Sequence, residues 1–95
     1  MQQDMQHNPM EKTETAIRQI ITNVTTLTHD VPGDADLYLD LGVASVHALE
    51  LLTGLEEAFG VAVPDDEFVE ATSINKLTAM MRGLMNQAEG ESVSA

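Results

Sequence analysis

Apolar residues recur at helical spacing in three stretches of the chain. In residues 11–29 they fall at Ile17, Ile20, Ile21, Val24 and Leu27. In residues 45–59 they cluster on one arc of a helical wheel, at Ala48, Leu51, Leu52, Leu55 and Phe59. Toward the C-terminus, as far as about Ala88, they fall at Ile74, Leu77, Met81 and Leu84. Because side chains at this period share one face of a helix, the pattern predicts three amphipathic helices.

Helix-breaking and capping residues divide the predicted helices. Pro32-Gly33 should end the first helix. Gly60 should end the second, because it follows the last helical turn directly. Residues 61–64 should be extended, since a proline disfavours helix in the residue before it. Thr72 or Ser73 should cap the last helix.

A short helical turn is predicted between the second and last helices. Three acidic residues follow Pro64, and acidic side chains favour the start of a helix. Phe68 and Val69 in this turn are then available to the core. This element and the three longer helices make the predicted fold all-α, with three main helices and one short helix.

The connection over residues 30–44 is unusually long for such a small protein. Leu37, Leu39 and Leu41 alternate with polar or aromatic residues, as in a short strand, although no partner strand is evident. A loop pinned to the core by these leucines fits equally well. We expect one helical domain over residues 11–88, with disordered tails at 1–10 and 89–95.

Charge is distributed very unevenly along the chain. The net charge is −12, and residues 30–70 hold eleven acidic residues and no basic one. Nucleic-acid binding requires cations that displace counterions, so this composition argues against it, and an anionic membrane would repel the same segment. The expected partners are therefore proteins with basic surfaces, which should bind in a salt-sensitive way.

Other compositional features exclude further classes of protein. There is no Cys, which excludes disulfides and thiolate metal sites and suits a cytoplasmic protein. The N-terminal residues lack the basic and apolar regions of a signal peptide, and no apolar run is long enough to span a membrane. We expect a monomer that does not insert into membranes.

Two groups of candidate metal ligands do not match known sites. The acidic loop that begins at Asp34 has Leu39 and Ser45 where a calcium loop requires Gly and Glu. His7, His29 and His47 lie on separate segments without metal-ligand spacing. We expect no metal site and interpret the histidines as solvated side chains.

Ser45, at the start of the second helix, is the candidate for covalent chemistry. The residues around it do not form a nucleophile elbow. His47 follows two positions later and should point away from it around the helix, so no local base is available. The simplest structural interpretation is that Ser45 caps the helix.

The helix that follows Ser45 carries an unusual exposed stripe. Opposite its apolar arc lie Val46, Glu50, Thr53 and Glu57. A solvated face normally mixes charges of both signs to gain ion pairs, whereas this stripe has no base and its like charges repel. The stripe is therefore a candidate docking face.

Three motifs in the central region together resemble the acyl carrier protein family. They are DLGVASV at residues 40–46, LEEAFGV at 55–61 and VPD at 63–65, with Glu50-Leu51 between the first two. The resemblance covers about residues 11–88 and implies a four-helix bundle with three main helices and one short one.

The resemblance implies a non-catalytic carrier. A phosphopantetheinyl transferase would attach 4′-phosphopantetheine from coenzyme A to Ser45, and the arm's thiol would hold acyl intermediates as thioesters for fatty-acid, polyketide or related biosynthesis. The reactive sulfur would thus come with the cofactor in a protein without Cys. Basic-faced acyl-handling enzymes would dock on Val46, Glu50, Glu56 and Glu57.

The sequence departs from the family pattern beside the serine. Members usually have Asp-Ser-Leu where this chain has Ala44-Ser45-Val46, and His47 takes a position that is often acidic or small. These changes imply either a dedicated transferase or slower modification. The alternatives are an aminoacyl or peptidyl carrier, which has the same arm, and an unmodified acidic helical adaptor.

Three methionines crowd the last helix, at positions 80, 81 and 85. Methionine commonly fills irregular gaps in a core. The other interpretation is a deformable wall that admits an acyl chain between the helices.

Overall fold

The computed structural model describes residues 9–94, and it describes the surroundings of side chains for residues 11–87. Four helices make up its regular structure: α2 (Pro9–Val24), α3 (Ser45–Phe59), α4 (Asp65–Glu70) and α5 (Ile74–Ser94). The described part of the chain contains no strand, so the predicted all-α class is confirmed. None of these helices combines the length and apolar content needed to cross a bilayer.

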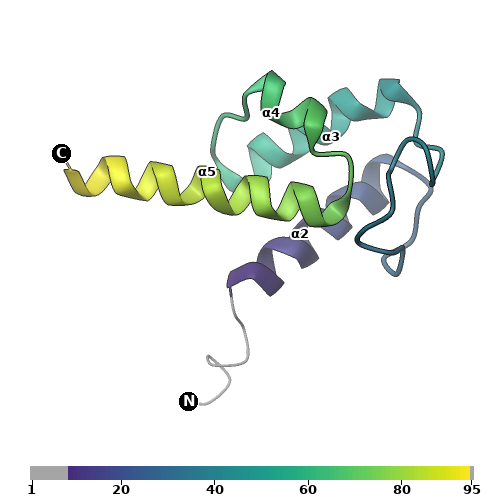
Figure 1. Cartoon of the computed structure of the whole chain (residues 1–95), viewed down its shortest axis with the longest axis horizontal. Helices are drawn as coiled ribbons and strands as arrows, with labels where there is room; N and C mark the ends of the chain where they lie inside the picture. Colours follow the sequence, from purple (N-terminus) through teal and green to yellow (C-terminus); the bar gives the residue numbers. More distant parts are fainter. Residues whose placement is uncertain (1–8, 95) are drawn as a thin grey trace, which may run out of the picture.

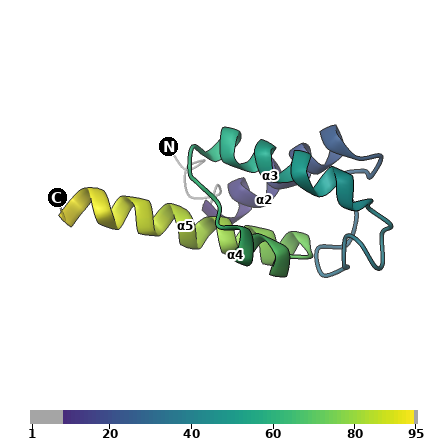
Figure 2. The ribbon, with the colours of Figure 1, turned by 90° about the horizontal axis from the view of Figure 1, so that it is seen from above.

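Helix α2 is the centre of the packing. It contacts both α3 and α5, while the short α4 packs against α5. Figures 1 and 2 show that α5 is the longest element and that its C-terminal part extends beyond the other helices. The end of α2, the long loop and the starts of α3 and α5 gather at the opposite end of the molecule (Figure 1).

The core is built from the apolar arcs predicted for the three long helices. Ile17 and Ile21 of α2 are buried, as are Leu51 and Leu55 of α3. All four residues predicted for the last helix are buried, namely Ile74, Leu77, Met81 and Leu84. Met81 therefore fills the core, and Met80 and Met85 are partly buried against it.

The predicted ends of the first and last helices were wrong. Helix α2 begins at Pro9, which is well suited to a first helical position, and ends at Val24 instead of His29. Thr25 ends it, because its hydroxyl donates to the Ile21 carbonyl at 2.7 Å and accepts the Leu27 N–H at 3.0 Å. Leu27 still packs against the core, but from an irregular segment.

At the other end of the chain, α5 continues through Ser94, so most of the predicted C-terminal tail is helical. No proline interrupts residues 85–94, and the single Gly90 costs only about 1 kcal/mol of helix propensity. Residues 1–8 of the predicted N-terminal tail, and Ala95, lie outside the described residues.

The long loop is a series of turns pinned to the helices, and the strand alternative was wrong. Leu37 is the main anchor: its side chain is buried, its N–H donates to the Thr72 carbonyl at 2.8 Å, and its carbonyl accepts the Val43 N–H at 2.9 Å. Leu39, by contrast, is 87% exposed. Leu41 is partly buried against the core, so the loop is held mainly at Leu37, with a smaller contribution from Leu41, and forms no strand.

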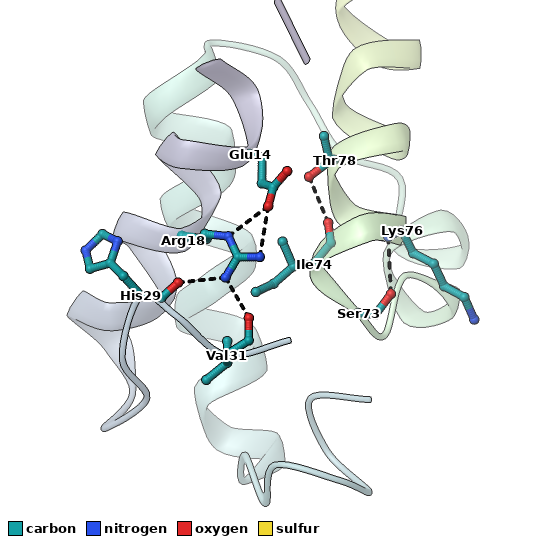
Figure 3. A network of polar contacts seen from close by, with 8 residues as sticks. All are labelled: Glu14, Arg18, His29, Val31, Ser73, Ile74, Lys76 and Thr78. Carbon is teal, nitrogen blue, oxygen red and sulfur yellow. Dashed lines mark hydrogen bonds and ion pairs between the residues drawn. The ribbon is translucent and has the colours of Figure 1, made fainter. Parts of the chain in front are cut away.

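Arg18 of α2 fixes the first part of this loop. Its guanidinium bonds the Glu14 carboxylate and donates through Nη1 to the carbonyls of His29 and Val31, each at 2.7 Å (Figure 3). A guanidinium can serve several acceptors at once because its N–H groups are fixed in one plane. One of the four basic residues of the chain is therefore used to hold the fold.

The start of α5 forms the other support of the loop. The N–H of Asn75 donates to the Gly33 carbonyl at 3.0 Å. Ser73 caps the helix as predicted, since its hydroxyl accepts the Lys76 N–H at 3.2 Å (Figure 3). The loop is therefore tied to both α2 and α5 before it reaches α3.

Candidate functional site

The segment that leads into α3 is held in one conformation by backbone geometry. Gly42 has a φ of +74°, in the left-handed region that favours glycine. Earlier in the same loop, the Asp36 carboxylate accepts the N–H groups of Tyr38 and Leu39 at 2.9 and 2.8 Å. The Leu39 N–H in particular holds the pKa of Asp36 below its usual value. This acidic stretch therefore uses its carboxylates to build a turn.

Ser45 is the first residue of α3 and is exposed. The prediction that it caps the helix was wrong, because Ala44 is the N-cap residue and offers no side-chain oxygen. Within the described part of the chain the Ser45 hydroxyl makes no hydrogen bond. The structure therefore presents a free serine hydroxyl at the tip of a rigidly held helix.

His47 does not serve Ser45 as a base. Its Nδ1 lies 3.3 Å from Oε1 of Glu50, one turn further along α3. Since an ionised carboxylate can only accept, Nδ1 carries the proton in this contact. His47 is also partly buried, so it differs from the solvated side chain that the sequence suggested.

The predicted docking stripe is exposed on α3. Val46 is 64% exposed, and Glu50, Thr53 and Glu57 are also exposed. Leu49, which was assigned neither to the apolar arc nor to the stripe, is 69% exposed and lies one turn after Ser45. An exposed Leu beside an exposed Val makes the first turns of α3 more apolar than the sequence analysis indicated.

Glu56 differs from the other predicted docking residues. It is partly buried, and its Oε2 accepts the backbone N–H of Val63 at 2.9 Å. The bond ties the end of α3 to the extended segment before α4. The structure therefore gives Glu56 a role in the fold and leaves Glu50 and Glu57 as the exposed acids of this face.

The short helix α4 adds acidic surface near the end of α3. Asp65, Asp66 and Glu67 form its first turn and are exposed. Phe68 is buried as predicted, but Val69 is 67% exposed, because adjacent side chains on a helix point about 100° apart and Phe68 is the one that faces the core. The prediction that Val69 reaches the core was wrong.

Comparison with known proteins shows which family this sequence resembles. The model of a family described as "Phosphopantetheine attachment site" matches residues 15–81. The chain is also 30% identical, over 69 residues, to an acyl carrier protein of Campylobacter hominis, which covers 72% of this chain and 87% of the relative. The residues matched by the family model include α3, the loop before it and α4.

This similarity identifies the cofactor as a covalently attached 4′-phosphopantetheine. Within the residues that the family model matches, Ser45 presents an accessible hydroxyl without a competing hydrogen bond in the described part of the chain. The helical fold, the matched family model and the similar carrier protein together show that the chain belongs to the acyl carrier protein family.

Proposed function

We propose that Ser45 is the residue that carries the 4′-phosphopantetheine arm. The observation that supports this most strongly is its exposed, unbonded hydroxyl at the first position of α3. The residue also lies inside the span matched by the phosphopantetheine family model. A transferase would supply the chemical activation, so Ser45 needs access and not a neighbouring base.

In this proposal the protein is a non-catalytic carrier of acyl intermediates in fatty-acid, polyketide or related biosynthesis. When bound, the arm supplies a thiol that holds the acyl group as a thioester. The protein's own contribution is to hold Ser45 at a fixed, accessible point and to present a docking face beside it. The Ser45 segment is well suited to this, since Leu37 and Gly42 fix the backbone that leads to it.

The docking face in this proposal begins at Ser45 and follows the exposed side of α3. Val46 and Leu49 provide apolar contacts near the serine, while Glu50, Thr53 and Glu57 extend along the helix. The partners are the transferase and acyl-handling enzymes with basic surfaces. Charge complementarity of this kind mainly raises the association rate and sets the orientation of the complex.

Mass spectrometry of the intact protein tests the attachment site. The purified chain is incubated with coenzyme A, Mg²⁺ and a broad-specificity phosphopantetheinyl transferase. We expect the mass of one phosphopantetheine to be added to the wild type and not to Ser45→Ala. An unmodified wild type, or equal addition to both proteins, would contradict the proposal and favour an acidic adaptor or another attachment residue.

Charge reversal tests the docking face. Glu50→Lys and Glu57→Lys should weaken binding to an acyl-handling enzyme at low salt, and the difference from wild type should shrink as salt screens the charges. Asp34→Lys is the matched control, because Asp34 is exposed in the loop and the charge change is the same. If the control weakens binding as much as the α3 variants, net charge and not this face determines affinity.

A further inference from the structure

A small cavity lies beside the first turn of α3, at the end of the molecule where α2 stops. It has a volume of about 140 Å³ and is lined by residues 25–27, residues 41–44 and His47. Residue 44 directly precedes Ser45, so the cavity adjoins the proposed attachment point. The first group of lining residues is far from Ser45 in the sequence and is brought there by the turn at Thr25.

The lining of this cavity combines apolar walls with free polar groups. Leu27, Leu41 and Val43 are partly buried and supply the walls. The Thr26 hydroxyl makes no hydrogen bond within the described residues, and His47 engages Glu50 through Nδ1, which leaves Nε2 available. No Lys or Arg lines the cavity. Such a lining suits a neutral chain that carries both methyl and amide groups, and it does not suit a phosphate.

We propose that this cavity is the resting place for the neutral, amide-containing part of the phosphopantetheine arm. The inference rests on the proposed attachment at Ser45. A volume of about 140 Å³ is below the roughly 300–1,000 Å³ of pockets that enclose a whole drug-sized ligand, so it accepts one segment of the arm. The phosphate remains at Ser45, outside the cavity, and the acyl group lies beyond it.

Because the arm would be covalently attached at Ser45, weak contacts with the cavity are enough to keep it there. A group attached one residue from the cavity experiences an effective concentration on the order of millimolar, so contacts too weak to capture a free ligand still populate the bound position. On the other side of α3, toward α4, Val63 and Phe68 are buried in the core, so an arm that entered there would have to displace them. The cavity side therefore requires less rearrangement of the protein than the α4 side.

Nuclear magnetic resonance of the unmodified and arm-loaded proteins tests this proposal. Residues 41–49 are uninformative, since they adjoin Ser45 and will shift wherever the arm lies. Residues 25–27 are diagnostic for the cavity, and residues 61–68 for the α4 side. We expect arm-dependent shifts at 25–27 that exceed those at 61–68, with contacts between arm methyl groups and the Leu27 methyls. Shifts confined to 41–49, or larger at 61–68, would overturn the assignment.

Thr26→Val removes the free hydroxyl while keeping the shape of the side chain. Loss of one hydrogen bond should lower the ratio of bound to free arm by roughly two- to tenfold, and so reduce the arm-dependent shift at Leu27. Thr15→Val, at an exposed position of α2 outside the cavity, is the matched control and should leave that shift unchanged. Equal effects of the two variants, or no effect of either, would contradict a role for the Thr26 hydroxyl in seating the arm.

The two proposals fail in different ways. A chain that gains no arm, or gains it on a residue other than Ser45, refutes the proposed function. A chain that is fully loaded at Ser45, with its shifts at 61–68, refutes only the cavity.

Discussion

Glu56 and Val63 are joined by a hydrogen bond in which the Val63 N–H donates to the Glu56 carboxylate at 2.9 Å. Glu57, the next residue, is exposed and makes no such hydrogen bond in the described part of the chain. Two adjacent glutamates with the same charge therefore have different roles. One holds the segment before α4, and the other belongs to the proposed docking face.

This difference predicts that two alanine substitutions will change the free energy of unfolding by different amounts. Glu56→Ala should lower the free energy of unfolding by about 1–3 kcal/mol, because it leaves the N–H of a buried residue without its charged acceptor. Glu57→Ala should change it by less than about 0.5 kcal/mol, as is usual at exposed positions. Urea unfolding measures both, and equal values would show that the Glu56–Val63 bond contributes no stability.

Two glycines should also respond in opposite directions to alanine. Gly42→Ala should destabilise the protein by about 1 kcal/mol, since its φ of +74° strains a residue with a Cβ although there is space for one. Gly83 lies within α5, and a Cβ there would also meet no neighbour. Gly83→Ala should therefore stabilise the protein by about 0.5–1 kcal/mol through helix propensity. A stabilising Gly42→Ala would contradict the backbone geometry before Ser45.

The sequence predicted most of the buried residues of the three long helices, but it did not predict which side chains bond to the backbone of other segments. The period of apolar residues identified the buried residues of α3 and α5, because burial and helical period are directly linked. It placed the end of α2 too late, since Leu27 continues the apolar spacing while Thr25 has already ended the helix. The roles of Glu56 and Leu37 depend on contacts between distant segments, which no local pattern contains.

The exposed residues of the candidate site were predicted from the sequence, but its helix cap and its cavity were not. Ser45 and the exposed stripe followed from the motif and the helical wheel, and the structure exposes both Ser45 and the stripe. The cap, however, is Ala44, because the helix begins at Ser45 itself, one residue earlier than a serine cap would require. The cavity beside His47 depends on where α2 stops, and the spacing of apolar residues predicted that end too late in the chain.

Ala44 is a position where stability can be gained. Ala44→Ser supplies the side-chain oxygen that the start of α3 lacks and should raise the free energy of unfolding by about 1 kcal/mol. Ala62→Ser, in the exposed segment before α4, is the control and should have almost no effect. Thermal unfolding measures both, and an unchanged midpoint for Ala44→Ser would indicate that the first turn of α3 is already satisfied.

Acid should weaken the turn built on Asp36. The N–H of Leu39, followed by that of Tyr38, lowers the pKa of Asp36 in the folded protein, so the stabilisation is present above the unfolded pKa of about 3.9. It is lost as the pH falls through the lower, folded value. Asp36→Asn removes this titration, so the stability difference between wild type and variant should shrink below pH of about 4. A difference that stays constant with pH would contradict the assigned hydrogen bonds.

Locating the modification on the chain is the most direct test of the central claim. The protein is treated with coenzyme A and a transferase, digested, and its peptides are fragmented in a mass spectrometer. We predict a single phosphopantetheine on Ser45 and unmodified serine at positions 73, 92 and 94. Modification at any of those three residues, or complete absence of the group under conditions that load another carrier protein, would contradict the assignment of Ser45.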